Sequence, residues 1–196
     1  MWIKICGMTS ETAVAAALAA GVDAVGFVFS DSLRCVTPQR ARELALPARG
    51  RTRCVAVTRH PAPALVAEIL AVFAPDVLQT DAADIAALQL PGALELLPVV
   101  RAGDAAPTQL PGRILFEGPA SGSGVPSDWQ AARALAARTQ LVLAGGLTRD
   151  NVAAAIRTAK PFGVDVSSGV GERPGVKSPG AIREFVAAVR AAEAVT

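Results

Sequence analysis

The 196-residue chain contains no tyrosine, and its other aromatic residues are six phenylalanines and two tryptophans. So few aromatic rings provide no row of platforms on which nucleic-acid bases could stack. The formal net charge is only +2, and the arginines are scattered among acidic residues instead of forming a basic stripe. We find no signature of nucleic-acid binding and expect no nucleic-acid partner.

Long apolar runs are also missing. Hydrophobic residues make up 52% of the chain, but no uninterrupted apolar stretch approaches the roughly 18 residues of a membrane-spanning helix. Much of the apolar fraction is alanine, which suits helices packed on a sheet. The first residues also lack the charged region and apolar core of a secretory signal. We therefore expect a protein that has no membrane partner.

Cysteine and histidine are scarce. Cys6, Cys35 and Cys54 are odd in number and far apart, so they predict no disulfide framework and favour a reducing, cytoplasmic location. His60 is the only histidine and precedes Pro61, which is typical of a surface or capping residue. These cysteines and this histidine lack the spacing of metal ligands, so no metal is expected.

Apolar, strand-like runs alternate along the chain with alanine-rich helical runs. The predicted strands cover residues 3–6, 24–29, 54–57, 76–79, 94–100, 113–116, 141–144 and 163–166. The predicted helices cover residues 11–20, 38–46, 62–73, 84–89, 128–138, 149–159 and 179–192. The connection over residues 102–112 holds two prolines and two glycines. The fifth helix is therefore expected to be reduced to a turn.

This alternation indicates an α/β fold. Strands that are buried on both faces and separated by crossover helices form a parallel sheet. Eight such units in sequence predict a single-domain (β/α)8 TIM barrel over residues 1–196, although this length is near the lower limit for a barrel. An open, doubly wound sheet is the alternative.

The first strand ends at a candidate nucleophile or base. Active sites of TIM barrels lie at the carboxyl ends of the strands, and Cys6 stands there, followed by Gly7. The glycine allows a ligand or another backbone to approach closely. The alternative is that Cys6 only packs in the core, because free cysteines are among the most buried residues.

Small residues follow the last three strands and predict a phosphate site. Their backbone N–H groups, at a helix terminus, provide favourable potential for an anion. Glycine pairs are also common in ordinary turns, which is the alternative for each loop taken alone. The predicted phosphate-binding residues lie within 121–124, 144–147 and 165–169, and they are Gly122, Gly124, Gly145, Gly146, Ser167, Ser168 and Gly169.

Charged residues follow other strands. Arg34 follows the second strand, and its guanidinium group could hold a carboxylate through paired hydrogen bonds. Asp81 and Glu117 follow the fourth and sixth strands and could act as acid or base. Glu117 directly follows the apolar run 114–116, and apolar surroundings favour the protonated form of a carboxyl group. The alternative is that these three are solvated loop residues. Asp23 precedes the second strand and is expected at the opposite, stability end.

Five motifs occur in the order of a known family. They are KICGMT at residues 4–9, DAVGFVF at 23–29, SLR at 32–34, GGL at 145–147 and GVDVSSGV at 163–170. The chain resembles the phosphoribosylanthranilate isomerase family of tryptophan biosynthesis, and the resemblance spans its whole length. It implies an Amadori rearrangement of N-(5-phosphoribosyl)anthranilate to the corresponding 1-deoxyribulose 5-phosphate on a (β/α)8 barrel, without a cofactor.

The resemblance also implies residue roles. The partner is a small phosphorylated aminosugar, and the protein is expected to be a monomer or a homodimer. Cys6 matches the general base, and Lys4, two residues earlier on the same face of the strand, is one source of positive potential for its thiolate. Glu117 occupies the position of the general acid. Arg34 matches the residue that engages the anthranilate carboxylate, and Gly146 and Ser168 match phosphate contacts. The other substrate-binding residues expected are Gln79, Asp81 and Asp165.

Some positions depart from the family pattern. The family has aspartate where this chain has Glu117, and usually histidine where it has Asp81. Near the end, Gly171 and Ser178 replace an acidic residue each, although Glu172 is adjacent. The alternatives are therefore a divergent isomerase that uses another aminoaldose phosphate and a non-catalytic binder of a phosphorylated ligand.

Overall fold

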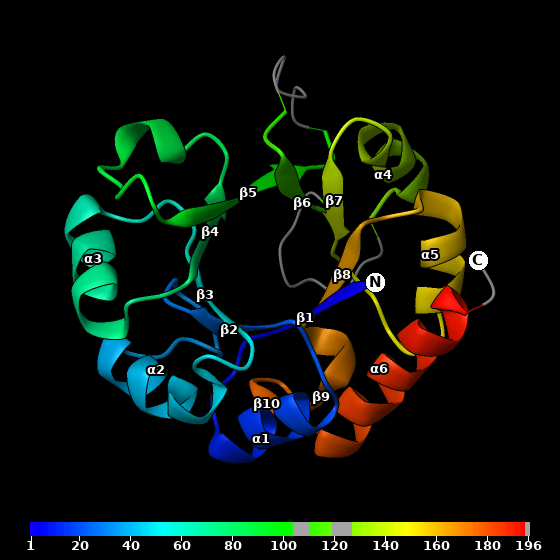
Figure 1. Cartoon of the computed structure of the whole chain (residues 1–196), viewed down its shortest axis with the longest axis horizontal. Coiled ribbons are helices and arrows are strands. Elements are labelled where there is room, and N and C mark those ends of the chain that lie inside the picture. The colour runs from blue at the N-terminus through cyan, green and yellow to red at the C-terminus, as the bar shows by residue number, and fades with distance from the viewer. Residues whose placement is uncertain (104–109, 119–126, 195–196) are drawn as a thin grey trace.

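Eight parallel strands close into a barrel in chain order in the computed structural model, which describes residues 1–103, 110–118 and 127–194 (Figure 1). The strands are β1 (Trp2–Cys6), β2 (Ala24–Val28), β3 (Arg53–Val57), β4 (Val77–Asp81), β5 (Glu95–Arg101), β6 (Arg113–Glu117), β7 (Gln140–Leu143) and β8 (Gly163–Val166). β8 pairs with β1 and completes the ring. The predicted TIM barrel is confirmed, and the alternative of an open doubly wound sheet is wrong.

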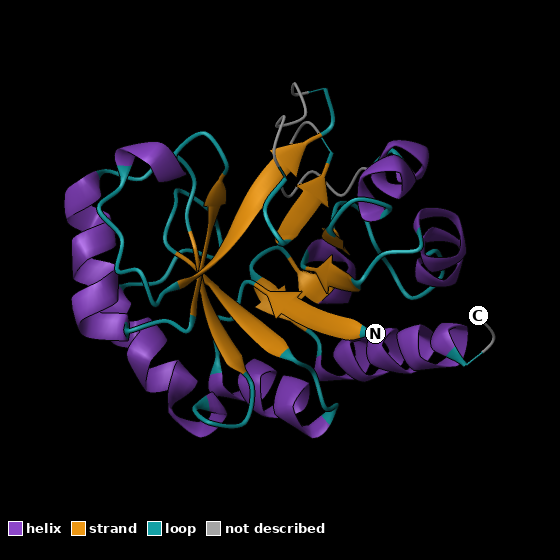
Figure 2. Cartoon of the chain, turned by 45° about the horizontal axis from the view of Figure 1, so that its top comes forward, coloured by secondary structure: helices purple, strands orange, loops and turns teal. Residues whose placement is uncertain are grey.

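Helices surround the barrel, as the purple elements of Figure 2 show. They are α1 (Glu11–Ala19), α2 (Pro38–Ala45), α3 (Pro63–Glu68), α4 (Trp129–Ala136), α5 (Val152–Ala159) and α6 (Pro179–Glu193). The short helix η1 (Leu46–Ala48) extends α2, and a π-helical turn, η2 (Ile69–Phe73), extends α3. Within the described residues, none of the helices is long and apolar enough to cross a bilayer.

Side-chain caps explain where several helices begin. The side chains of Ser10, Thr37, Asp128 and Ser178 accept hydrogen bonds from backbone N–H groups in the first turns of α1, α2, α4 and α6. Each bond satisfies a donor that has no partner inside the helix.

The wall between β4 and β6 differs from the prediction. Residues 84–89 do not form a helix but one 3-10 turn, η3 (Ile85–Ala87), because Pro91 and Gly92 end the helical pattern after little more than one turn. The expected turn in place of the fifth helix falls partly on residues 104–109, outside the described residues. The described residues on either side, 102–103 and 110–112, contain no helix.

A hairpin after β8 was not predicted. It consists of β9 (Gly171–Arg173) and β10 (Val176–Lys177), which pair antiparallel. It follows the short helix η4 (Ser168–Val170) and therefore stands at the carboxyl-end opening of the barrel, which we call the mouth.

Alternation along each strand divides the core into two parts. On β1, Ile3 and Ile5 point outward and pack against the helices, whereas Lys4 and Cys6 lie on the inward face. A second apolar cluster fills the middle of the barrel and consists of Ala24, Val55, Val77, Leu97, Val99, Leu115, Val142 and Ala144. The barrel is therefore packed and not a pore.

Charged side chains close the amino end of the barrel. Glu95 on β5 forms ion pairs with Arg53 and with Arg113, whose Nη1 lies 2.9 Å from Glu95 Oε1. The Arg113 guanidinium also lies 5.7 Å from the ring centre of Trp2 and 4.6 Å from that of Phe162. We call this group the floor of the barrel.

Asp23 lies near this floor, as the sequence predicted. Its Oδ2 accepts a hydrogen bond of 2.8 Å from the backbone N–H of Ile3. In the same way, Asp76 Oδ2 accepts a hydrogen bond of 2.7 Å from the backbone N–H of Cys54 on β3. These carboxylates join the loops before β2 and β4 to the neighbouring strands.

Gly163 at the start of β8 provides a test of the packing at the floor. A Cβ atom there would lie 2.6 Å from the Trp2 carbonyl oxygen and 3.0 Å from the Trp2 Cβ. We expect Gly163→Ala to lower the free energy of unfolding by about 1–3 kcal/mol, measured by chemical denaturation. Gly92→Ala is the control, because nothing lies within 4 Å of its added Cβ. Equal stabilities of the two variants would contradict this account of the floor.

Candidate active site

Cys6 ends β1 on the inward face, at the mouth of the barrel. Cys6 is 7% exposed. The next residue, Gly7, has a φ of +81°, and the N–H groups of Gly7 and Met8 both donate to the Gly26 carbonyl at 2.9 Å. The chain therefore turns away directly after the cysteine, which leaves the thiol at the end of the strand.

A buried ion pair lies below the thiol. Lys4 and Asp165 are register partners on β1 and β8, and Lys4 Nζ donates to Asp165 Oδ1 at 2.8 Å. Burial opposes the charge of Lys4, but Asp165 and Cys6 outweigh this effect and raise the pKa of Lys4 above its usual value. The expected shared face of Lys4 and Cys6 is confirmed. Asp165 engages Lys4 here, and its contact with substrate stays a prediction.

Lys177 on β10 is a second lysine near the thiol, and it was missed in the sequence. Its Nζ donates to the carbonyl oxygen of Ser167 at 2.7 Å and to the Ser167 Oγ at 3.1 Å. Burial lowers the pKa of Lys177 to about 8, although the nearby Cys6 acts in the opposite direction. The hairpin thus delivers a cationic group to the mouth that titrates near neutral pH.

Burial raises the pKa of the Cys6 thiol above its usual value. The positive charges of Lys4 and Lys177 act in the opposite direction but do not overcome the burial. Without substrate, the residue is therefore held mainly as a thiol at neutral pH. The lysines lower the free energy needed to ionise the thiol, compared with burial alone.

Gly26 on β2 makes room for both groups. A Cβ atom at this position would lie 3.1 Å from Cys6 Sγ and 3.1 Å from Lys4 Cε. Any larger residue would have to displace the thiol or the lysine chain.

Arg34 lies in the loop after β2 and crosses above Gly7. A Cβ on Gly7 would come within 2.4 Å of Arg34 Cδ, so the glycine allows the arginine to cross at that height. A cavity of about 400 Å³ separates this loop from the hairpin and is lined by Leu33, Arg34, Ser168, Gly171, Glu172, Arg173, Pro174, Gly175, Val176 and Lys177. The guanidinium predicted to hold a carboxylate thus borders an open cavity.

The loops after β7 and β8 lie against each other, as the phosphate-site prediction requires. Gly145 and Gly146 have φ angles of +90° and +60°, and Asn151 Nδ2 holds the Gly146 carbonyl at 2.8 Å. A Cβ on Gly169 would lie only 1.9 Å from the Leu147 carbonyl oxygen. Ser168, the residue before Gly169, is the first residue of the short helix η4.

Ser167 links the same loops to β1, because its Oγ donates to the Cys6 carbonyl at 3.0 Å. Two other predicted phosphate contacts, Gly122 and Gly124, lie outside the described residues. Anion binding by these loops stays a prediction.

A second charged group lies on β4, β5 and β6. Arg101 on β5 forms ion pairs with Glu117 on β6 and with Asp81 on β4, the latter with 2.5 Å between Nη2 and Oδ1. The three side chains are 10–14% exposed. Although burial opposes its charge, the two carboxylates raise the pKa of Arg101 above its usual value. The apolar surroundings expected for Glu117 are therefore wrong, because the strand alternation brings Arg101 beside it.

Beside this group, Asp81 also approaches His60. His60 Nε2 lies 3.6 Å from Asp81 Oδ2, and His60 Nδ1 lies 2.9 Å from Asp84 Oδ1. Burial disfavours a charged Asp84, but hydrogen bonds from His60 and Thr80 outweigh it and lower the pKa of Asp84. His60 is mostly exposed, as predicted for a surface residue.

One ligand atom from each of His60, Asp81 and Asp84 lies within 4.8 Å of the others, a grouping that the spacing of the cysteines and of His60 did not indicate. The charge of Arg101 on Asp81 opposes a cation there. Gln79 lies two residues before Asp81, on the same face of β4. It is buried, and its Oε1 has no hydrogen-bond partner among the described residues. Its predicted contact with substrate fits this unsatisfied acceptor but stays a prediction.

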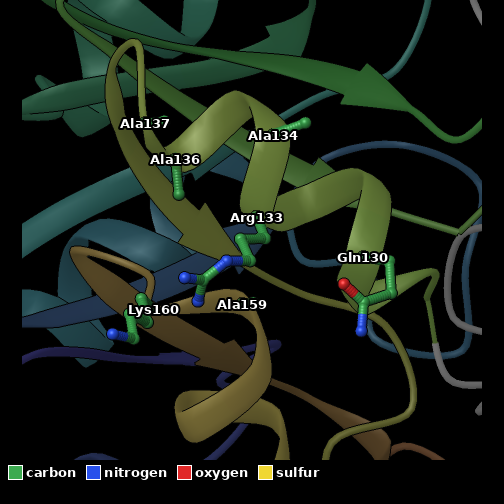
Figure 3. Close-up of a pocket in the computed structure, with 7 residues that line it drawn as sticks. All are labelled: Gln130, Arg133, Ala134, Ala136, Ala137, Ala159 and Lys160. Carbon is green, nitrogen blue, oxygen red and sulfur yellow. The ribbon is translucent and has the colours of Figure 1, made fainter.

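Another cavity, of about 410 Å³, lies between α4 and α5 (Figure 3). Its lining is mostly alanine, with Gln130, Arg133 and Lys160 around it. None of the candidate residues at the mouth borders this cavity, so it is separate from the candidate site.

The comparisons with known proteins agree with this geometry. The family model described as PRAI, N-(5'phosphoribosyl)anthranilate (PRA) isomerase, matches residues 3–188. The chain belongs to this isomerase family. Among curated members, the N-(5'-phosphoribosyl)anthranilate isomerase of Mesorhizobium japonicum is 38% identical over 97% of this chain and 95% of its own length.

Solved structures of the isomerase family share the fold. TrpF from Jonesia denitrificans is 35% identical, covers 98% of each chain and has a TM-score of 0.83. A phosphoribosyl anthranilate isomerase in complex with reduced 1-(o-carboxyphenylamino)-1-deoxyribulose 5-phosphate is 26% identical, with a TM-score of 0.79 over 97% of this chain and 99% of that chain. The resemblance noted from the sequence motifs is therefore confirmed.

The raised pKa of Cys6 predicts how its alkylation depends on pH. Only the thiolate reacts with iodoacetamide. In a Cys35→Ser variant, which removes the exposed thiol, we expect Cys6 to react slowly at neutral pH, with a rate that still increases above the usual thiol pKa of 9.0. Mass spectrometry of the Cys6 peptide measures the rate.

Cys54 is the internal control for this measurement. It is also buried, and burial raises its pKa to about 11. It should react more slowly than Cys6 at each pH, because Cys54 is fully buried whereas Cys6 is 7% exposed at the mouth. A Cys6 rate that levels off below about pH 8 would show that the lysines outweigh burial.

Proposed function

We propose that this isomerase converts N-(5-phosphoribosyl)anthranilate to 1-(2-carboxyphenylamino)-1-deoxyribulose 5-phosphate, with Cys6 as base and Glu117 as acid. The observation that carries the proposal is the placement of both groups on the inward face at one mouth. They end β1 and β6, and the loops that follow β7 and β8 lie between them in the ring. A sugar whose phosphate is held by those loops would lie between the acid and the base.

Binding begins with the two anionic ends of the substrate. The backbone at Gly146 and Ser168 provides N–H groups for the phosphate, and their loops are held together by close glycine contacts. Arg34 borders the neighbouring cavity and would pair with the anthranilate carboxylate. Lys177, between these two regions, adds positive potential for both anions.

Ring opening requires an acid. Glu117 donates a proton to the furanose ring oxygen, the bond between this oxygen and C1 breaks, and the nitrogen lone pair forms the C1=N double bond of a protonated Schiff base. The ring oxygen stays on the sugar as the C4 hydroxyl group, so this scheme needs no metal or cofactor. A carboxyl group held close to the ring oxygen lowers the barrier because no encounter step remains.

Proton transfer from C2 follows. The Cys6 thiolate removes the C2 proton, the C2–H electron pair forms a C1=C2 double bond, and the electron pair of the C1=N bond returns to nitrogen, which gives an enolamine. This enol then tautomerises to the ketone product. Lys4 and Lys177 favour the thiolate but do not overcome its burial, so ionisation of Cys6 makes turnover keep increasing with pH through neutral pH.

A second candidate is the same rearrangement on another aminoaldose phosphate. Asp81 favours it, because this carboxylate stands at the mouth where the family usually has histidine, and a changed charge can change substrate preference. A comparison of turnover for several aminoaldose phosphates separates the candidates. We further expect a cytoplasmic enzyme that is a monomer or a homodimer and has no nucleic-acid or membrane partner.

Removal of either reacting group tests the proposed roles. We expect Cys6→Ala and Glu117→Ala each to lower kcat by about 100-fold or more, because general acid–base catalysis contributes this much. The decrease of substrate fluorescence with purified protein measures turnover. Cys35→Ala is the control, since this thiol is exposed and should not matter. Normal turnover in both site variants would exclude the mechanism.

Substitution of Arg34 tests the carboxylate contact. We expect Arg34→Met to raise KM by about 10- to 100-fold with a smaller change in kcat, because the variant loses a charge-assisted pair made in both ground and transition states. Initial rates over a range of substrate concentrations separate the two constants. A variant with unchanged KM would place the anthranilate carboxylate elsewhere.

A further inference from the structure

Arg101 joins two of the positions at which this chain departs from the family pattern, Asp81 and Glu117. Its Nη1 pairs with Glu117 Oε1, and its Nη2 pairs with Asp81 Oδ1 at 2.5 Å. Glu117 and Arg101 are also register partners on β6 and β5, so their side chains leave adjacent strands on the same inward face. No role in the proposed chemistry has been assigned to this arginine so far.

The length of the glutamate makes such a contact important. A glutamate has one more rotatable bond than an aspartate, so its carboxyl group can occupy more positions at the mouth. An acid that is displaced by about 1 Å can lose about 100-fold in rate. A guanidinium group that holds one carboxyl oxygen limits Glu117 to orientations within reach of β5.

Asp81 restricts the arginine in turn. Because a guanidinium is planar, contacts on two of its nitrogens from opposite sides fix the plane as well as the position of the group. Asp81 lies on β4 and Glu117 on β6, so the contacts come from the two strands that flank Arg101. All three side chains are at least 86% buried, which limits screening by water.

We propose that Arg101 is a positioning residue that holds the Glu117 carboxyl group at the sugar site, and that Asp81 anchors Arg101. This arrangement, the Arg101 clamp, consists of Asp81, Arg101 and Glu117. The inference rests on the proposed role of Glu117 as the acid. It explains why the longer acid and the acidic residue after β4 occur together in this chain.

The clamp is tested by steady-state kinetics of Arg101→Gln. We expect kcat to fall by about 10- to 100-fold while KM stays within about twofold, because the ion pairs of the clamp join β4, β5 and β6 and, among the described residues, do not include Arg34 or the loops after β7 and β8. Arg101→Lys, which keeps the charge but lacks the planar guanidinium fork, should recover part of the loss. Asp81→Asn should give a smaller fall in kcat than Arg101→Gln. Thermal unfolding of each variant reports whether it folds.

Glu117→Gln provides the decisive background. If Arg101 acts through Glu117, Arg101→Gln should cause no further loss of kcat in this variant. Arg113→Gln is the matched control, because it removes a pair between an arginine and a glutamate of the same two strands at the floor, far from the mouth. It should leave kcat unchanged.

The outcomes separate the clamp from the proposed function. An active parent with an impaired Glu117→Gln variant but normal kcat in Arg101→Gln would overturn the clamp alone. The clamp alone would also be overturned if Arg101→Gln changed mainly KM. It would be overturned likewise if Arg101→Gln lowered kcat by the same factor in the Glu117→Gln background as in the parent. A parent without turnover, or a fully active Glu117→Gln variant, would overturn the assigned acid and the clamp with it.

Discussion

Lys4 and Asp165 face each other across the two strands that complete the ring, and both are almost entirely buried. Removal of one partner from such a pair leaves an unpaired charge in the interior and commonly destabilises a protein by about 3–5 kcal/mol. The pair also lies directly below Cys6, and Lys4 contributes positive potential to the thiol. Closure of the barrel and the electrostatics of its reactive sulfur therefore depend on the same contact.

The inward face of the barrel is organised in three levels by the alternation of side chains along parallel strands. Paired charges around Glu95 and Arg113 close the amino end, an apolar layer fills the middle, and paired charges return at the mouth. At the mouth three cationic side chains have an acidic or polar partner: Lys4 has Asp165, Lys177 has Ser167, and Arg101 has two carboxylates. Charged groups are thus held in fixed positions before any ligand arrives, which is the state that catalysis by preorganised groups requires.

The sequence predicted the barrel well, because strands buried on both faces and separated by helices leave few other arrangements. It placed Cys6 and Glu117 correctly at strand ends for the same reason. Arg101 was missed although it lies only one residue beyond the predicted strand at 94–100 and continues its inward alternation. Lys177 could not be found in this way, because its strand has only two residues and therefore no period. Contacts between neighbouring strands, such as the ion pairs of Arg101, depend on the register around the ring, which local patterns do not specify.

The packed middle of the barrel and the charged floor have a consequence for the passage of molecules. With no channel through the apolar layer, the ketose must leave through the opening by which the aminoaldose entered. Substrate and product then compete for one vestibule. Any group at the mouth that binds the arriving substrate tightly would also slow the departing product, so tight capture and rapid release oppose each other in this enzyme.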